Sequence, residues 1–151
     1  MEPYCDGQEF TILVIQNADG IPVALLPTQI VLHHDTLFDY RKKYLSTSDT
    51  TYYTPPQRND SVVQLIRSQA VQVFQIFGIK DIVRLDGRLL SDGKIRRSDI
   101  NRMSGMEQNS FLFQQTSLLG WTHRDTLHYL IHKNLPSRVD ESHKILIPIV
   151  F

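Results

Sequence analysis

The stretch VRLDGRLLSDGKIRRSDIN, residues 83–101, carries the clearest signal for local structure in the sequence. Its Asp92-Gly93 pair is a dipeptide that strongly favours a two-residue turn between antiparallel strands. Such a turn places Ser91 opposite Lys94 and so determines which residues face each other along both strands. The sequence therefore predicts a β-hairpin with a defined register.

Four polar residues meet at the open end of this predicted hairpin. The register places Asp86 opposite Asp99. It also places Arg84 opposite Asn101. Since side chains alternate between the two faces of a strand, all four are expected on one face. Two carboxylates and a carboxamide supply the hard oxygen ligands that Mg²⁺ takes, often together with phosphate oxygens. The pattern indicates a magnesium and phosphate site, and a solvent-exposed hairpin face that simply carries charges is the alternative.

The segment after the hairpin has the composition expected at the rim of a binding site. Residues 102–106 (RMSGM) contain Gly105, whose backbone N–H can approach an anion closely. Ser110 follows at a position where a helix is expected to begin.

Two apolar segments near the N-terminus predict a further hairpin or meander. They are residues 10–16 (FTILVIQ) and residues 21–26, and a turn sequence joins them. Residues 46–60 are polar and contain Pro55-Pro56, which disfavours both a helix and a central strand. We therefore expect a loop there.

Two segments show helical spacing of apolar residues. The first follows Asn59-Asp60-Ser61, which offer N-cap side chains, has its apolar residues between Val62 and Phe77, and ends at Gly78. The second has one apolar stripe that Pro136 closes, made of Leu127, Leu130, Ile131 and Leu135. Residues 136–151 fit no upstream pattern, so the chain is divided into a domain over residues 1–135 and a divergent tail over 136–151.

Composition limits the possible partners. The 151 residues are 41% hydrophobic and carry 16 basic and 16 acidic side chains, so no net charge attracts nucleic acid or an anionic membrane. The single cysteine, Cys5, cannot form an internal disulfide, which favours a reducing compartment. No segment has the length of a membrane-spanning helix or the order of a signal peptide. We expect a cytoplasmic protein, or a plastid stromal one in a plant.

Four blocks of the sequence resemble, in order, the signature of the ATP-grasp domain of D-alanine-D-alanine ligases. That signature runs from an EFTV-like strand through an FYDYxxKY segment and an RxD strand to an ExNxxPGM loop. The matching blocks are residues 9–12 (EFTI), 38–44 (FDYRKKY), 84–86 (RLD) and 99–106 (DINRMSGM). The resemblance covers roughly residues 2–135, and the order and spacing of its blocks make it more specific than any single block.

The resemblance implies a fold, an activity and cofactors. The implied fold is α+β, the C-terminal subdomain of an ATP-grasp domain, with a largely antiparallel sheet and helices packed on one face. In that family ATP with Mg²⁺ phosphorylates the carboxylate of one D-alanine. The amine of a second D-alanine then attacks the acyl phosphate, which yields a precursor of cell-wall peptidoglycan.

It also implies roles at the reacting centre. The matching metal ligands are Asp86, Asp99 and Asn101. Arg84 and the backbone N–H of Gly105 match the groups that stabilise the developing oxyanion. Tyr44 matches a tyrosine that helps to close a loop over the site.

Further positions match contacts with the nucleotide and the acceptor. Glu2 and Glu9 match acidic residues that contact adenine and ribose, and Lys43 matches a lysine that contacts phosphate. Ser110 matches the position that holds the carboxylate of the second D-alanine, with Asn109 beside it in place of a more usual histidine.

Departures from the family pattern suggest that the chain does not catalyse the reaction alone. Asp99 stands where the family has glutamate, and Ser104 stands where proline stiffens the loop. The domain that binds the first D-alanine and the preceding ATP-grasp subdomain are absent from this sequence. We therefore expect a partner, either the missing N-terminal ligase half or a second copy of the chain. The alternative, indicated by the same departures and by Arg96 and Arg97, is a non-catalytic module that acts in dimerisation or regulation.

Several aromatic and histidine residues are expected to have structural roles. His128 and His132 lie four residues apart but without the glutamate of an HExxH motif, so solvated histidines are favoured over a metal site. Tyr52 and Tyr53 are expected to pack rather than to stack on a ligand. Trp121 is expected to be a core anchor between two helices.

Overall fold

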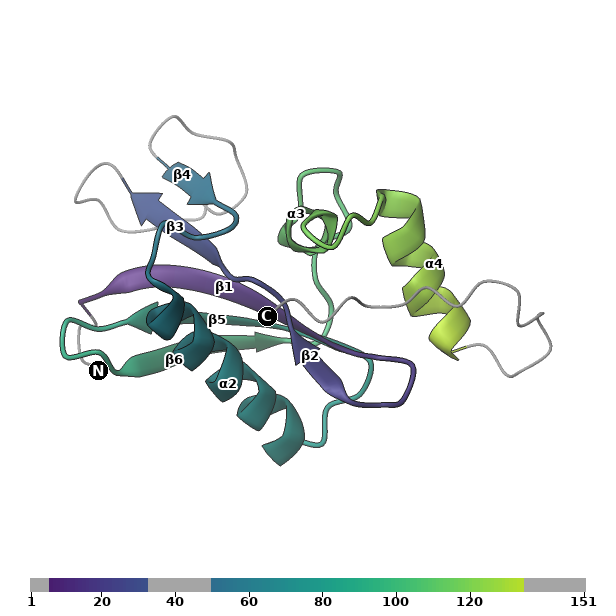
Figure 1. Ribbon diagram of the computed structural model, residues 1–151, viewed down its shortest axis with the longest axis horizontal. Helices are drawn as coiled ribbons and strands as arrows, with labels where there is room; N and C mark the ends of the chain where they lie inside the picture. The colour runs from purple at the N-terminus through teal and green to yellow at the C-terminus, as the bar shows by residue number, and fades with distance from the viewer. Residues whose placement is uncertain (1–5, 33–49, 135–151) are drawn as a thin grey trace.

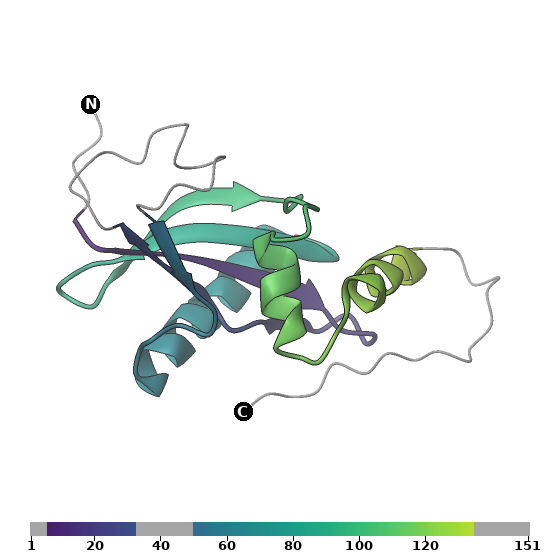
Figure 2. The same ribbon diagram turned by 90° about the horizontal axis from the view of Figure 1, so that it is seen from above.

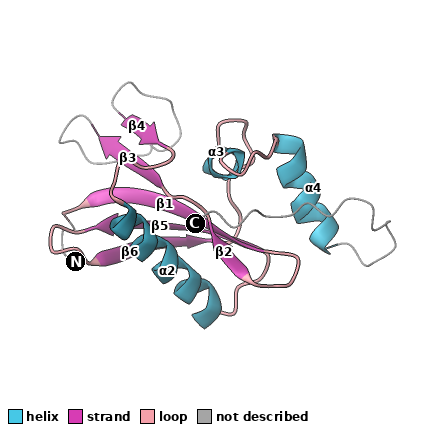
Figure 3. Ribbon diagram, viewed as in Figure 1, coloured by secondary structure: helices cyan, strands magenta, loops and turns pink. Residues whose placement is uncertain are grey.

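The computed structural model describes residues 6–32 and 50–134 and has an α+β fold (Figure 1). Within these ranges six strands form one sheet with the order β4-β3-β1-β5-β6, and β2 also pairs with β1. All pairings are antiparallel. The strands are β1 (Gln8–Gln16), β2 (Pro22–Ala24), β3 (Thr28–Leu32), β4 (Thr50–Tyr53), β5 (Ile82–Leu89) and β6 (Ile95–Asn101). The helices are α2 (Asp60–Ile76), α3 (Phe111–Ser117) and α4 (His123–Asn134), shown in cyan in Figure 3.

Helices cover both faces of the sheet, because β1 is apolar on both of its faces. Phe10, Ile12 and Val14 pack with the buried residues of α2. Leu13 and Ile15 point the other way and pack with residues of α3, α4 and the turn between them. The prediction of an antiparallel α+β fold is confirmed, but the expectation that all helices lie on one face is wrong (Figure 2). No helix in the described ranges is long and apolar enough to span a membrane.

The hairpin of β5 and β6 has the predicted register at its open end, but its loop is longer than predicted and a bulge compensates for the difference. The loop has three residues instead of two, since the N–H of Leu90 donates to the carbonyl of Lys94 at 2.8 Å. Gly93 is the third residue of this loop. Its φ of 79° lies in the left-handed region, which the third residue of such a loop typically adopts. This loop shifts the pairing by one residue. A register shift between Asp86 and Gly87, where Ser98 is the extra residue of β6, shifts it back.

The predicted pairs at the site are consequently correct. Arg84 lies opposite Asn101, and Asp86 lies opposite Asp99.

The other predicted elements are partly confirmed. The N-terminal hairpin forms from β1 and β2. The helix α2 begins as predicted, with the Asn59 side chain accepting a hydrogen bond from the N–H of Val62 at 3.1 Å. However, Phe77 at its end is 64% exposed and does not extend the packed face.

One prediction on secondary structure is wrong, and one on packing is correct only in part. Part of the expected loop over residues 46–60 is the strand β4, which forms because the edge of β3 offers it a hydrogen-bonding partner. The apolar stripe expected on α4 packs in part, since Leu127 and Leu130 lie against the core whereas Ile131 is 56% exposed. Thr126 and Tyr129 are buried although they are not in the stripe. The ring of Tyr129 lies 4.9 Å from that of Trp121, which is buried as predicted.

One buried amide ties α3 to the central strand. β1 pairs with β3 over residues 9–11 and with β2 over residues 14–16, so its outer edge lacks a strand partner between them. There the Gln115 side chain accepts from the N–H of Leu13 at 2.9 Å and donates to the carbonyl of Thr11 at 3.1 Å. It also donates to the hydroxyl of Thr28 at 3.1 Å. A side chain of α3 thus replaces the missing strand.

We predict that Gln115→Leu lowers the free energy of unfolding by about 3 kcal/mol. Leucine fills a similar volume but leaves a buried N–H and a buried carbonyl of β1 without partners, and each such group costs about 1–3 kcal/mol. Urea denaturation of the whole chain measures the change. The control is Gln114→Leu on the same helix, whose partly exposed amide bonds only to Asn109 and Thr54, so a loss below about 1 kcal/mol is expected. Equal losses in the two variants would contradict the role given to Gln115.

Candidate functional site

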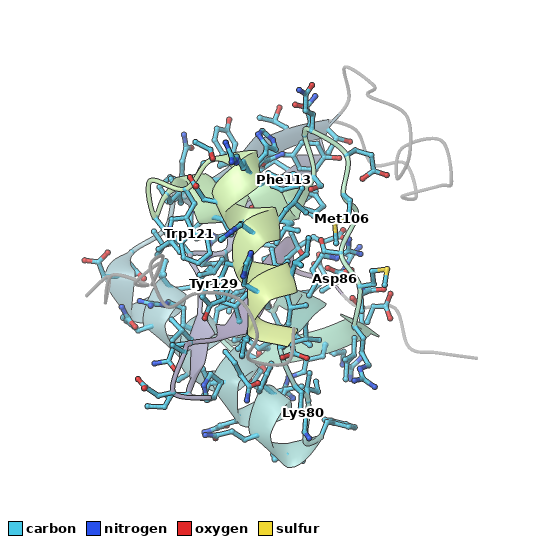
Figure 4. The ribbon with its side chains drawn as sticks, turned by 90° about the vertical axis from the view of Figure 1, so that its right-hand side faces the viewer. Lys80, Asp86, Met106, Phe113, Trp121 and Tyr129 are labelled. Atoms are coloured by element: carbon cyan, nitrogen blue, oxygen red, sulfur yellow. The ribbon has the colours of Figure 1, made fainter. Side chains whose placement is uncertain are left out.

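The predicted site lies on the sheet face that α3 and α4 only partly cover. These helices pack on the half of that face that carries Leu13 and Ile15. On the other half, Glu9 pairs with Arg88 across β1 and β5, and Thr11 pairs with Asp86. Figure 4 shows Asp86 below Met106. Polar residues of β1 and β5 therefore share one region of the sheet.

The Asp86 carboxylate is the centre of this region. The Thr11 hydroxyl donates to its Oδ1 at 2.7 Å. The Arg84 guanidinium donates from Nε to Oδ1 and from Nη2 to Oδ2, both at 3.1 Å. The Asn101 amide donates to Oδ2 at 3.1 Å. The side chains of Asp86 and Arg84 are only 17% and 16% exposed, so the carboxylate is shielded and its charge is balanced within the site.

The side-chain oxygens at this site suit a hard cation such as Mg²⁺ only if phosphate oxygens of a bound molecule complete its coordination. Asp86 and Asn101 are in contact, and Asp99 lies opposite Asp86, where its own carboxylate accepts from the N–H of Ile100 at 2.9 Å. In the described ranges no three His, Cys, Asp or Glu side chains are grouped to hold a metal ion. Two carboxylates and one amide oxygen do fit Mg²⁺ that is also held by phosphate oxygens. Asn101 would then have to turn its amide oxygen toward the cation.

An aromatic ring borders Arg84. Its guanidinium carbon lies 6.0 Å from the centre of the Phe111 ring, within the range of a cation–π contact. Tyr52 meets the same ring edge to face, with 5.4 Å between the ring centres, so it packs as predicted. Burial, and secondarily the charge of Glu9, raises the pKa of the Tyr52 hydroxyl, so it stays protonated near neutral pH. Through Phe111, α3 therefore borders the guanidinium, and β4 contacts α3 through Tyr52.

The loop after β6 brings two buried hydroxyl groups to the site's border. The Oγ atoms of Ser104 and Ser110 are buried and have no hydrogen-bond partner among residues 6–32 and 50–134. Ser110 is the N-cap residue of α3, yet its hydroxyl makes no capping bond. The carboxylate of Glu107 occupies the space that a side chain at position 105 would need, so this arrangement requires a glycine there.

The nucleotide and acceptor residues are less completely placed. Glu9 is partly buried and bonds to Arg88 at 3.3 Å, on the border of a hollow that Gly7, Gln8 and Ile30 also line. Asn109 is exposed, and its carbonyl accepts from Gln114 at 2.8 Å. Glu2, Lys43 and Tyr44 lie outside the described residues, and so do Cys5 and the tail.

The sequence interpretation missed several residues that the structure places here. Thr11 lies within the quoted EFTI block, but no turn links β1 to β5 closely enough to reveal that it faces Asp86. Phe111 and Tyr52 come from separate segments, so only the folded chain brings Phe111 to Arg84 and Tyr52 to Phe111. Arg88 could have been predicted from the sequence. Arg84, Asp86 and Arg88 are alternate residues of one strand, so their side chains lie on the same face.

The chain matches known proteins along most of its length. The family described as "D-ala D-ala ligase C-terminus" matches residues 1–132. The D-alanine-D-alanine ligase of Tolumonas auensis is 34% identical over 100 residues, covering 66% of this chain and 30% of that protein. The same-named enzyme of Parabacteroides distasonis is 28% identical over 138 residues, covering 91% of this chain and 41% of that protein.

The fold is similar to that of solved ligases as well. The crystal structure of the VanG D-Ala:D-Ser ligase from Enterococcus faecalis aligns with 89% of this chain and 38% of its own, with a TM-score of 0.73 at 22% identity. This likeness supports the ATP-grasp fold. The chain spans 30–41% of the length of the two curated relatives named above. By the family match over residues 1–132, the chain belongs to the family of the D-alanine-D-alanine ligase C-terminus.

Proposed function

We propose that this chain supplies the Mg²⁺-ATP and acceptor side of an ATP-dependent D-alanine-D-alanine ligase site. The observation that carries the proposal is the contact of Arg84, Asp86 and Asn101 on the open half of the sheet. These are three of the residues that match the family's reacting centre. A cytoplasmic setting is part of the same proposal.

Each residue would act through chemistry that its position allows. Asp86, Asn101 and Asp99 would hold Mg²⁺, which when bound neutralises phosphate charge and orients the transferring group. Arg84 would release Asp86 and donate hydrogen bonds to the developing oxyanion instead. The N–H of Gly105 would donate to the same oxygen. Glu9, with Lys43 and Glu2, would contact the nucleotide.

The acceptor side rests on Ser110. Its buried hydroxyl has no partner within the described part of the chain, as expected of a donor that is reserved for a ligand. We infer that it binds the carboxylate of the second D-alanine, with Asn109 beside it. The remainder of the site would come from the part of a ligase that these residues do not match, so these 151 residues alone would be inactive.

A second candidate is a non-catalytic module for dimerisation or regulation. It is favoured by three apolar side chains that are exposed on β6 and the following loop, Ile100 at 38%, Met103 at 79% and Met106 at 52%. Sedimentation of the chain at high concentration tests this candidate, which is excluded if neither a dimer nor a partner that binds without nucleotide is found.

We predict that the chain binds ATP at millimolar Mg²⁺ and that Asp86→Ala abolishes the binding, because the cation loses its most buried ligand. Isothermal titration calorimetry measures it. Asp86→Asn serves as a second variant that can keep the hydrogen bond from Thr11 and so favours folding. Asp92→Ala, at the exposed turn of the same hairpin, is the control and should bind like the unaltered chain. Absence of binding by the folded unaltered chain would contradict the proposal that this half forms a nucleotide site.

We predict that Ser110→Ala leaves the free energy of unfolding within about 0.5 kcal/mol, although loss of an N-cap hydroxyl usually costs about 1 kcal/mol. The reason is that this hydroxyl makes no capping bond. The same change should abolish the chemical-shift response of nearby backbone amides to D-alanine in an NMR titration. Ser117→Ala, whose hydroxyl bonds to a backbone carbonyl at the exposed end of α3, is the control and should keep that response. A D-alanine response that survives Ser110→Ala would exclude the acceptor role.

A further inference from the structure

The shortest hydrogen bond to the Asp86 carboxylate comes from a residue with no assigned role. Thr11 Oγ1 donates to Asp86 Oδ1 at 2.7 Å, against 3.1 Å for each of the bonds from Arg84 and Asn101. Thr11 and Asp86 are direct partners in the ladder of β1 and β5. Thr11 is 1% exposed, so the bond is shielded from water.

Among the side chains that donate to Asp86, Thr11 is the one that can keep its hydrogen bond when the cation and the substrates are bound. Under the proposed function Arg84 is needed at the oxyanion and Asn101 must present its oxygen, instead of its NH₂ group, to the cation. Both residues then stop donating to Asp86. Only the Thr11 bond remains to orient the carboxylate.

The backbone around Thr11 makes it a rigid support. Its carbonyl accepts from Gln115 at 3.1 Å, and its residue position is paired with Thr28 on one side and with Asp86 on the other. A β-branched side chain has a single, restricted χ1 torsion between the main chain and the hydroxyl. Arg84, in contrast, reaches Asp86 through a long and flexible side chain.

We propose that Thr11 is a positioning residue that holds the Asp86 carboxylate in place for a divalent cation. The inference rests on the proposed function, because it assumes that Asp86 is a cation ligand. Partners that orient a metal ligand typically change metal affinity by about 10- to 100-fold when they are removed.

The test is a titration of the whole chain with Mn²⁺, followed by electron paramagnetic resonance. We expect Thr11→Val, which keeps the shape and removes the hydroxyl, to weaken Mn²⁺ binding about 10-fold. Thr11→Ser restores the donor and should bind within about twofold of the unaltered chain, by the same reasoning. The matched control is Thr28→Val on the neighbouring strand, which removes another fully buried hydroxyl but one that bonds to Thr54 and Gln115. It should lower stability without weakening Mn²⁺ binding.

A second readout needs no cation. Asp86 holds the Asn101 side-chain amide, so its NMR resonances should shift in Thr11→Val and return in Thr11→Ser. Unchanged resonances, or unchanged Mn²⁺ affinity in Thr11→Val, would overturn the role of Thr11 and leave the proposed cation site standing. If the folded unaltered chain does not bind Mn²⁺, the cation site itself fails and the positioning role fails with it, even if the Asn101 resonances respond.

Discussion

The hydrogen bonds of the Gln115 side chain to β1 support both the fold and the site. β1 is buried on both faces and changes its edge partner from β3 to β2 along its length. Without Gln115, a backbone N–H and a backbone carbonyl in the middle of the central strand would be buried with no partner. Because Gln115 belongs to α3, the same contact determines where α3 lies on the sheet. Ser110 and Phe111 therefore reach the border of the site through a contact that is required for stability.

Four charged groups of the candidate site are neutralised in two pairs. Arg84 pairs with Asp86, and Arg88 pairs with Glu9, on the same face of β5 and β1. A partly buried carboxylate without such a partner would be costly, since a charge removed from water needs a counter-ion. A cation that binds Asp86 therefore does not enter an open negative site but replaces an arginine. This exchange would couple cation binding to the release of Arg84, because one guanidinium cannot hold Asp86 and an oxyanion through the same two N–H groups.

Elements and contacts encoded by contiguous residues could be predicted from the sequence. Those that depend on contacts between separate segments could not. The hairpin of β5 and β6 was predictable because its turn, its strands and its polar residues are contiguous. Even there, a three-residue loop and a bulge at Ser98 offset each other, so the correct pairs arose from an incorrect turn. The strand β4 was missed because its stability comes from β3, which lies earlier in the chain and gives no local signal. The packed face of α4 was predicted only in part, since Thr126 and Tyr129 are buried by contacts with Thr116, Gln16 and Trp121, which all lie outside the helix.

The separation of the sheet face into an apolar and a polar half explains how one strand pair serves both the fold and the site. Along β1, the residues on this face are Glu9, Thr11, Leu13 and Ile15, so polarity changes between Thr11 and Leu13. Along β5, the change falls between Arg84 and Ile82, which face Leu13 and Ile15. Gln115 contacts β1 at this boundary, through the carbonyl of Thr11 and the N–H of Leu13. Helix packing on the apolar half therefore aligns the strands that present Thr11 and Asp86 on the polar half, and a site of this kind cannot be ordered unless α3 has docked.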